Sequence, residues 1–381
     1  MNITNDIKYI GVKDTNIKFF EGQYKIDNGV KYNSYLILDD KIALMDLVEI
    51  TFKNEWLTKI KEIIKYKKID YLIIHHMEPD HSSSLKEILK EYKDITIVST
   101  LKSFELMKSF YNLDITNKII IKHLDTLNLG KHTLTFYLAP MVHWPEVMVS
   151  YDNYDKALFS ADAFGKFGVN DDNWLNDARH YYFSIIGKYG EQVKRLLNII
   201  NNLEVKYILS LHGEILKDNI DYYLNIYKLW SSYKYENEGI IIVYGSMYGN
   251  TKEAAFYLYN KLKELNIDVV IYDVHEIDLH YLISEAFKYK KLILASPTYN
   301  NDIFPFMKFF LLSLISRNYQ NREIGLIENG GWSIVSNKMI KDLFSKSKNI
   351  KFYENEITIQ SSLKEENIDK MNKLINEIHN N

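Results

Sequence analysis

The chain of 381 residues contains no cysteine. This absence excludes disulfides, iron–sulfur clusters held by cysteine, and iron or zinc sites held by thiolates. Any metal ion that the protein binds must therefore be held by nitrogen and oxygen atoms.

Excess charge and long apolar runs are also missing. The net charge is −3 and no block of lysine and arginine stands out, which argues against a general nucleic-acid binder. No apolar run is long enough to cross a bilayer, and residues 1–8 lack the basic and apolar regions of a signal peptide. We therefore expect a cytoplasmic protein that makes no membrane contact.

What is present fits a soluble globular protein, with 46% apolar and 25% charged residues. The length suggests two domains. All five prolines lie in or beside the loops discussed below, and proline stiffens a loop in the way that a preorganised site requires.

The first part of the chain indicates strands followed by a mixed α/β pattern. Apolar runs at 35–38 and 42–45 predict a hairpin around Asp39 and Asp40. Further strands are expected near 71–75, 95–99, 118–122, 133–138, 147–150, 157–159 and 207–210, and helices near 52–66, 83–92, 101–111 and 180–201.

From about residue 239 the pattern becomes regular. Strands are expected near 239–245, 268–273, 291–296, 323–327 and 351–358, alternating with helices near 250–265, 279–287, 303–316, 337–346 and 363–378. Such strand-then-helix units indicate a doubly wound parallel sheet. The segment Leu229–Gly239 is the best linker candidate, so we expect one domain over 1–235 and a second over 238–381.

Side chains that can bind metal are concentrated in His76-Met77-Glu78-Pro79-Asp80-His81, directly after the apolar run 71–74. A buried strand that ends in imidazoles and carboxylates can hold metal at the rim of a sheet. His143, Asp162 and His212 each follow a predicted strand and extend the set. The other histidines are more often core or surface residues; they are His75, His123, His132, His180, His275, His280 and His379.

This ordered set resembles the metallo-β-lactamase fold, whose motif is His-x-His-x-Asp-His followed by a distant His, Asp and His. Glu78 stands at the position of the second histidine, and with the His-Trp-Pro loop at 143–145 it makes the chain similar to the flavodiiron proteins (A-type flavoproteins). Spacing alone does not choose between His75 and His76, but the register of the motif selects His76. The resemblance implies one iron held by His76, Glu78 and His143, a second held by Asp80, His81 and His212, and Asp162 as the bridge.

The ligand chemistry agrees with two irons. Three carboxylates against two ferrous ions leave about one positive charge, enough to hold a bridging hydroxide. Oxygen and imidazole ligands suit iron with open positions for a small gas molecule. Tyr24 lies where some flavodiiron proteins place a tyrosine near the irons, although an ordinary loop tyrosine is an equally good interpretation.

A second constellation begins at Ile240–Thr251, which predicts a buried strand, a small polar turn and a helix start. The polar groups of Ser246, Asn250 and Thr251, together with N–H groups at the helix N-terminus, suit a phosphate, and Gly249 lets the backbone approach. A Walker lysine and a Gly-x-Gly-x-x-Gly pattern are absent, which weakens ATP and dinucleotide interpretations. The turn resembles the phosphate loop of flavodoxins.

Two later loops, 295–305 and 328–333, follow the third and fourth strands of this array. In a doubly wound sheet such loops meet at the carboxyl edge, where ligands bind. Tyr299 and Trp332 could flank an isoalloxazine ring, or they could pack on neighbouring helices. Glu328 and Gly330 differ from the glycine and the aromatic residue that many flavodiiron proteins have there. The expected FMN contacts are Ser246, Met247, Tyr248, Gly249, Asn250, Thr251, Pro297, Thr298, Tyr299, Asn300, Asn329, Gly330, Gly331 and Trp332.

The resemblance covers nearly the whole chain. It implies an oxidoreductase that reduces O2 to water, NO to N2O, or both, at a non-heme diiron site, with FMN relaying electrons. It also implies a head-to-tail homodimer, alone or as a dimer of dimers, and an external electron donor such as rubredoxin or a reductase. Two other interpretations stay open: a zinc hydrolase fused to a flavodoxin-like domain, against which Glu78 argues, and a non-catalytic FMN electron carrier.

Overall fold

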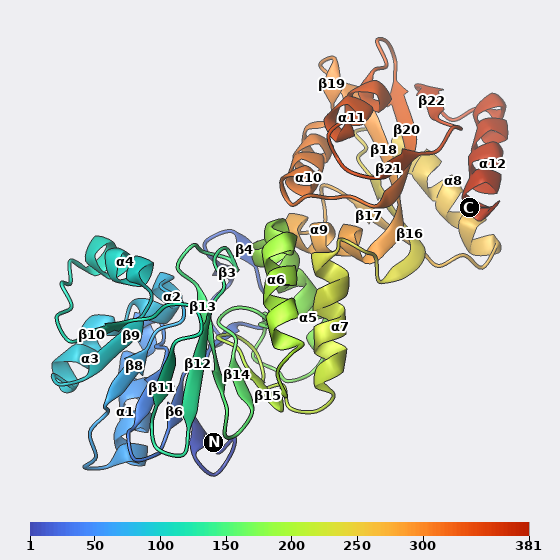
Figure 1. Ribbon diagram of the computed structural model, residues 1–381. Coiled ribbons are helices and arrows are strands. Elements are labelled where there is room, and N and C mark those ends of the chain that lie inside the picture. Colours follow the sequence, from blue (N-terminus) through green and yellow to red (C-terminus); the bar gives the residue numbers. More distant parts are fainter. Residues whose placement is uncertain (381) are drawn as a thin grey trace. The chain divides into compact units, whose positions relative to one another are not determined.

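The computed structural model describes residues 1–380 and divides into two compact units, Met1–Lys228 and Leu229–Asn381 (Figure 1). The expected linker 229–239 is only partly irregular, because α7 (Ile220–Ser231) runs into it and β16 (Asn237–Tyr244) begins inside it. The domain limits of 1–235 and 238–381 stay a prediction.

Two sheets pack face to face in the first unit. The larger sheet has the order β1-β6-β7-β8-β9-β10 and the smaller one the order β11-β12-β13-β14-β15. Their facing side chains, among them Ile37, Ile73, Phe136 and Phe159, share one apolar core. The strands are β1 (Ile7–Tyr9), β6 (Tyr35–Ile37), β7 (Ala43–Met45), β8 (Tyr71–Ile73), β9 (Thr96–Ser99), β10 (Lys118–Ile120), β11 (Thr126–Asn128), β12 (Thr133–Leu138), β13 (Met148–Asp152), β14 (Ala157–Phe159) and β15 (Tyr207–Leu209).

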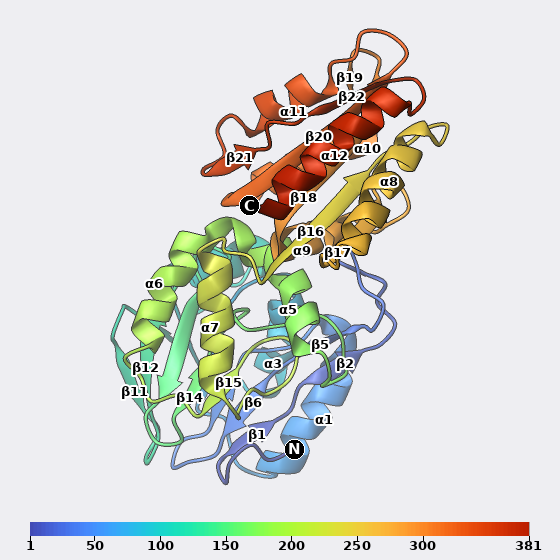
Figure 2. The same ribbon diagram turned by 90° about the vertical axis from the view of Figure 1, so that its right-hand side faces the viewer.

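Helices cover the outer faces of both sheets (Figures 1 and 2). The larger sheet is covered by α1 (Lys53–Ile64), α3 (Leu85–Glu91) and α4 (Leu101–Tyr111), and the smaller by α5 (Trp174–Tyr181), α6 (Gly190–Ile200) and α7. This αββα sandwich confirms the metallo-β-lactamase-like fold expected for the first domain. The short N-terminal pairs β2 (Val12–Asp14) with β5 (Val30–Tyr32), and β3 (Phe19–Phe20) with β4 (Tyr24–Lys25), were not predicted.

The helical segment expected at about 180–201 is confirmed, but it is not one regular α-helix. Between α5 and α6 the backbone forms a π-helical turn, Tyr182–Ile186, and a 3-10 turn, Gly187–Tyr189. Two glycines, Gly187 and Gly190, weaken helical continuity there. A π-helical turn shifts the register of side chains, and such turns are frequent at functional sites.

The second unit is a parallel sheet with the order β17-β16-β18-β20-β21, and β22 also pairs with β20. This is the flavodoxin-like strand order, so the expected doubly wound fold is confirmed. The prediction of one strand over 351–358 is wrong, because that segment is divided into β21 and β22. The strands are β17 (Val269–Asp273), β18 (Tyr289–Tyr299), β19 (Asp302–Ile303), β20 (Arg322–Gly330), β21 (Ile350–Phe352) and β22 (Ile357–Gln360).

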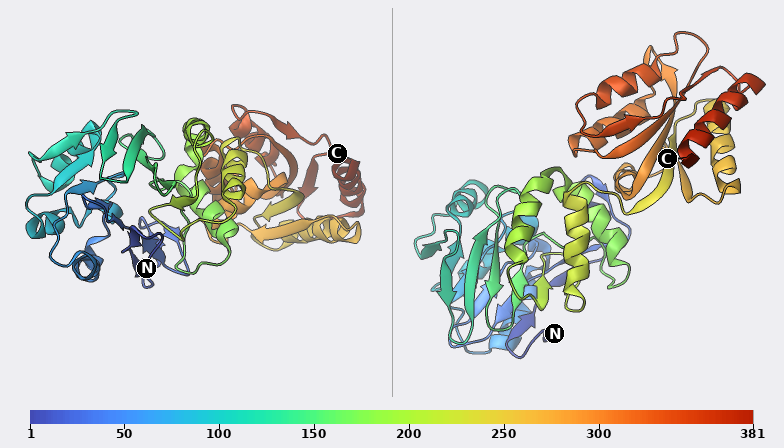
Figure 3. Two further views of the ribbon diagram at one scale, coloured as in Figure 1. Left: turned by 60° about the horizontal axis from the view of Figure 1, so that its bottom comes forward. Right: turned by 45° about the vertical axis from the view of Figure 1, so that its right-hand side comes forward.

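Five helices cover the two faces of this sheet (Figure 3). They are α8 (Asn250–Glu264) and α12 (Glu365–Asn380) on one face, and α9 (Leu279–Lys288), α10 (Pro305–Ser316) and α11 (Ser336–Phe344) on the other. Apolar residues of α8 and α12 share a core with the buried strands. Among residues 1–380, no helix is both long and apolar enough to span a bilayer.

The central strand of this sheet gives a stability prediction. Ile293 in β18 is fully buried in the core under α8 and α12. We expect Ile293→Ala to lower the free energy of unfolding by about 3 kcal/mol, because it removes buried methylenes and leaves a cavity. Urea unfolding of the FMN-free protein, followed by circular dichroism, measures this change. Leu265→Ala, at an exposed position, is the control and should change it by less than about 0.5 kcal/mol.

Candidate metal centre and flavin pocket

The predicted metal-binding side chains all follow strands of the sandwich. His76 and Glu78 come after β8, and His143 lies between β12 and β13. Asp162 comes after β14 and His212 after β15. Asp80 and His81 lie in the one-turn helix α2 (Pro79–Ser82).

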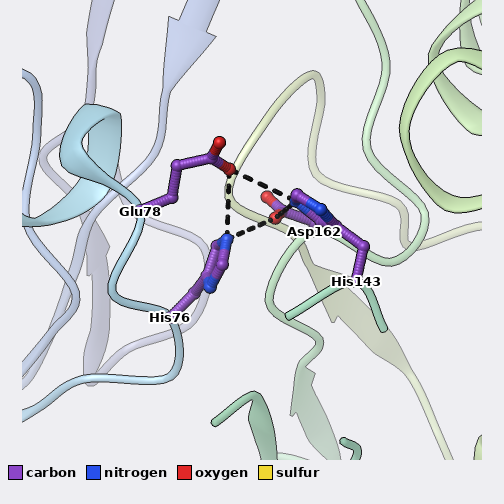
Figure 4. Close-up of side chains that lie close together, drawn as sticks. All are labelled: His76, Glu78, His143 and Asp162. Atoms are coloured by element: carbon purple, nitrogen blue, oxygen red, sulfur yellow. Dashed lines mark hydrogen bonds and ion pairs between the residues drawn. The ribbon is translucent and has the colours of Figure 1, made fainter. Parts of the chain in front are cut away.

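One group of donors consists of His76, Glu78, His143 and Asp162, whose side chains point toward one another (Figure 4). Glu78 Oε2 lies 3.2 Å from His76 Nε2 and 3.2 Å from His143 Nε2. Asp162 Oδ2 lies 3.2 Å from His76 Nε2 and 3.1 Å from His143 Nε2. Donors that each lie about 2.1 Å from one metal ion are separated by about 3.0–3.4 Å, so this spacing fits a shared ion.

A second group of donors consists of Asp80, His81 and His212. Asp80 Oδ2 lies 3.2 Å from His81 Nε2 and 3.3 Å from His212 Nε2, and the two imidazole nitrogens are 3.0 Å apart. The structure therefore brings together all seven residues that the sequence proposed as ligands, in the two groups that the resemblance implied.

Asp162 faces both groups. While its Oδ2 atom lies in the first group, its Oδ1 atom lies 3.5 Å from His81 Nε2 and 3.6 Å from His212 Nε2. A carboxylate that turns one oxygen to each group is arranged as a bridge.

The charge balance of this pocket tests whether cations fit it. Both oxygens of Asp80 and the Oδ1 atom of Asp162 are buried and accept no hydrogen bond from the described residues. Buried oxygens of this kind are costly unless a cation balances them. Nitrogen and carboxylate donors without sulfur suit iron. The residues present therefore fit two metal ions.

Electrostatics within the pocket point the same way. Burial disfavours the charged imidazole of His143, but hydrogen bonds to Asp162 and Glu78 outweigh it and raise its pKa to about 9. Burial opposes the negative charge of Asp162, but the charge of His76 and a hydrogen bond from His143 hold its pKa well below the usual range. The buried carboxylates are therefore stabilised by positive charge nearby, which protons on the histidines or metal ions can supply.

Two of the proposed ligand histidines are oriented by hydrogen bonds from their Nδ1 atoms. His76 Nδ1 donates to Glu146 Oε1 at 2.7 Å, and that oxygen also accepts the backbone N–H of Met77 at 2.9 Å. His212 Nδ1 donates to the backbone oxygen of Lys31 at 2.8 Å. Such contacts fix the tautomer that leaves Nε2 free for a metal. Sequence reasoning missed Glu146, although it closes the segment 139–146 that contains the ligand His143.

His75 is a core residue, as the sequence analysis assigned it. Its Nδ1 atom lies 2.6 Å from Asp46 Oδ2, and its Nε2 atom lies 2.7 Å from Ser150 Oγ. Asp46 Oδ1 also accepts the backbone N–H of His75 at 2.7 Å. Both ring nitrogens are therefore occupied by partners away from the metal donors.

Aromatic rings surround the donors. Tyr24 is the tyrosine that the resemblance placed near the irons. Its hydroxyl donates to the backbone oxygen of Ser184 at 2.9 Å, in the π-helical turn, and its role at the irons stays a prediction. The ring of Tyr181, which sequence reasoning missed, lies 5.3 Å from that of His212. Burial and the charges of Asp162, Asp80 and Glu78 raise the pKa of Tyr181. Tyr181 is the last residue of α5, and the π-helical turn begins directly after it.

The second predicted site forms a pocket at the carboxyl edge of the parallel sheet, with a volume of about 500 Å³. Twelve of the fourteen expected FMN contacts line it, and Asn301 and Ser361 line it as well; the complete lining is Ser246, Met247, Tyr248, Asn250, Thr251, Pro297, Thr298, Asn300, Asn301, Asn329, Gly330, Gly331, Trp332 and Ser361. Trp332 is 84% exposed and thus presents an open ring at this pocket.

The two other expected contacts lie elsewhere. Gly249 is the residue before α8 and does not itself line the pocket, but its backbone N–H donates to Ser246 Oγ at 3.1 Å. Tyr299 belongs to β18, pairs with Asp302 of β19, and lines a neighbouring hollow with Phe309 and Leu312. Their contact with FMN stays a prediction.

The partner of His76 generates the first site prediction. In Glu146→Gln the anionic partner of His76 is lost, so we expect the affinity for the ion in the first group to fall about tenfold or more. Anaerobic titration of the metal-free protein with ferrous ion measures it. Glu105→Gln, an exposed pair with Lys102 on α4, is the control. Unchanged affinity in Glu146→Gln would contradict the orienting role of Glu146.

The turn before α8 generates the second site prediction. Gly249 has φ +92°, a left-handed conformation, and an added Cβ would meet no atom within 4 Å. Gly249→Ala should therefore act through backbone strain alone and weaken FMN binding about tenfold. Gly249→Asn should weaken it less, because asparagine tolerates this conformation. Quenching of FMN fluorescence measures both; equal losses would contradict the strain argument.

Comparisons with known proteins agree with the fold of both units. A model described as ODP family beta lactamase matches residues 30–213, and a flavodoxin model matches residues 242–353. The chain is 31% identical to a nitric oxide reductase of Moorella thermoacetica over 362 residues, 91% of this chain and 90% of that protein.

Two solved structures extend this likeness. Rubredoxin oxygen:oxidoreductase from Desulfovibrio gigas has a TM-score of 0.92 and 26% identity, covering 100% of this chain and 98% of its own. The flavodiiron protein from Giardia intestinalis has a TM-score of 0.91 and 27% identity, covering 99% of this chain and 94% of its own. The present chain belongs to the flavodiiron protein family.

Proposed function

We propose that this chain is an oxidoreductase that reduces O2 to water, NO to N2O, or both, at a non-heme diiron centre, with FMN passing electrons from an external donor. The observation that carries the proposal is Asp162, which turns one carboxylate oxygen to each of two donor groups. A plain electron carrier has no use for this shared carboxylate. A zinc hydrolase can also bind two ions, and against it argues Glu78, which stands where the metallo-β-lactamase motif has a histidine.

The ligand assignment follows from the two groups. One iron would be held by His76, Glu78 and His143 and the other by Asp80, His81 and His212, with Asp162 as their shared ligand. Two irons held there would supply electrons and Lewis acidity to a small gas molecule, and FMN would supply two electrons at a time. The residues that line the pocket of the second unit would hold the flavin; the turn before α8 would bind its phosphate, and Trp332 would contact its ring.

The protein's own side chains keep the donors oriented and limit access of water. Trp144 lies edge-on to His76, with ring centroids 5.2 Å apart, and stacks with Phe110. At the second donor group, the ring centroid of Tyr32 lies 6.2 Å from that of His81, and the ring centroid of Phe20 lies 5.3 Å from that of His212. An apolar shell of this kind keeps the site's dielectric low and restricts the approach of solvent.

Partners and location are part of the proposal. With no cysteine, the chain cannot hold a rubredoxin-type iron, so electrons come from a separate donor. The Desulfovibrio gigas relative is named a rubredoxin oxygen:oxidoreductase, which makes rubredoxin the first donor to try. We also propose that two chains pair head to tail, singly or as a dimer of dimers, and that the protein works in the cytoplasm.

The proposal is tested on protein purified from iron-supplied cells. We expect two irons and one FMN per chain, and rapid consumption of O2, NO or both at an electrode after anaerobic chemical reduction. Asp162→Asn should keep its FMN and lose more than about 90% of the consumption, because the bridging ligand is removed. The FMN content of the same preparation controls for folding of the second unit.

Two outcomes would contradict the proposal, each in favour of a different alternative. Zinc at both positions, with no gas consumption, would favour the hydrolase interpretation. Iron and FMN at full occupancy with flat traces for both gases would favour the electron carrier.

A further inference from the structure

A buried lysine lies behind the metal centre and has no part in the ligand set. Lys166 follows Asp162 by four residues, and its side chain is fully buried. Its Nζ atom donates to the backbone oxygen of Asp172 at 2.9 Å and lies 3.3 Å from Asp177 Oδ2 and 3.3 Å from Glu214 Oε2. An ammonium ion is buried at high cost unless it is paired, so these contacts specify its position.

The partners of Lys166 come from separate segments of the chain. Asp177 is in α5, whereas Glu214 is two residues beyond the ligand His212. Glu214 Oε2 is buried and accepts no hydrogen bond from the described residues, so the ion pair with Lys166 is what balances its charge. The lysine thus connects the segment that carries Asp162 to the segment that carries His212.

The two segments are also packed backbone against backbone. Leu211 N donates to the backbone oxygen of Ala161 at 2.9 Å. A Cβ atom added to Gly213 would lie 2.7 Å from Lys166 Cγ, and one added to Gly165 would lie 3.3 Å from His212 Cβ. There is no room for a side chain between the two segments, and a shift of one must move the other.

We infer that Lys166 is a positioning residue, which ties the Asp162 segment to the His212 segment through Glu214 and so holds the second group of metal donors in register. The inference rests on the proposed diiron centre and adds a determinant of metal binding that makes no contact with metal. Because Glu214 and Gly213 adjoin His212, loss of the tie falls on the ion held by Asp80, His81 and His212. The ion of the first group keeps His76, Glu78 and His143.

Cobalt(II) titration of the metal-free full chain tests this, with the visible absorption of bound cobalt as the readout. Wild type should take up two ions per chain. Lys166→Met should bind one ion as wild type does and the other about 10–100-fold more weakly, as is typical when an outer partner is lost. Glu214→Gln should weaken the same ion. The double variant should be no worse than Lys166→Met alone, because both changes break one tie.

The controls separate positioning from general stability. Lys61→Met removes a lysine of α1 that pairs with Glu91 of α3, away from every group of possible metal donors, and should leave both cobalt ions in place. Circular dichroism melting identifies variants that fail to fold. If Lys166→Met is one of these, the isosteric Glu214→Gln decides alone.

Three results would overturn the inference: wild-type affinity for both ions in Lys166→Met, equal weakening of both ions, or losses in the double variant that are the sum of the single losses. A folded Glu214→Gln chain that binds both ions normally would do the same. A wild-type chain that takes up fewer than two ions would instead contradict the diiron centre itself, and this inference with it.

Discussion

The shared carboxylate of Asp162 is the constraint on which the rest of the first unit depends. Its two oxygens face different donor groups, so the segment after β14 must present it at one position and angle. The backbone reaches that position at a cost: Ala161 and Phe164, on either side of Asp162, have φ values of +51° and +69°. Left-handed conformations of non-glycine residues persist only where surrounding contacts enforce them. The backbone hydrogen bond from Leu211 to Ala161 is such a contact.

The metal ligands could be predicted because their signal is local. Four of them lie between His76 and His81, and the fold places the ends of β8, β14 and β15 near one another. The residues that orient the ligands carry no such signal. Glu146 is adjacent in sequence to the His143 loop, yet it binds His76, and only the tertiary fold decides between these histidines. In the sequence, Lys166 looks like an ordinary charged loop residue, and only the structure shows that its side chain is buried.

The fold of the second unit was predictable almost element by element, because buried parallel strands are continuous apolar runs separated by amphipathic helices. The failures arose where tertiary contacts extend or interrupt an element. β18 continues to Tyr299 through its pairing with β19, which carries this ring to a hollow beside the flavin pocket. In the first unit the helix breaks at Tyr182, whose ring packs against Tyr227 of α7, and periodicity alone cannot reveal that break.

The proposed ligands and contacts of each cofactor come from one unit. The seven proposed iron ligands lie between His76 and His212, and the residues that line the flavin pocket lie between Ser246 and Ser361. Binding of iron and of FMN are therefore separate local equilibria, each set by the preorganisation of a few loops. The rate of electron transfer depends on the distance between a flavin and an iron. That distance is set by how the units or chains assemble, not by the loops of either site. Changes at Lys166 or Glu146 should then act on metal occupancy, while changes in assembly should act on turnover with both cofactors still in place.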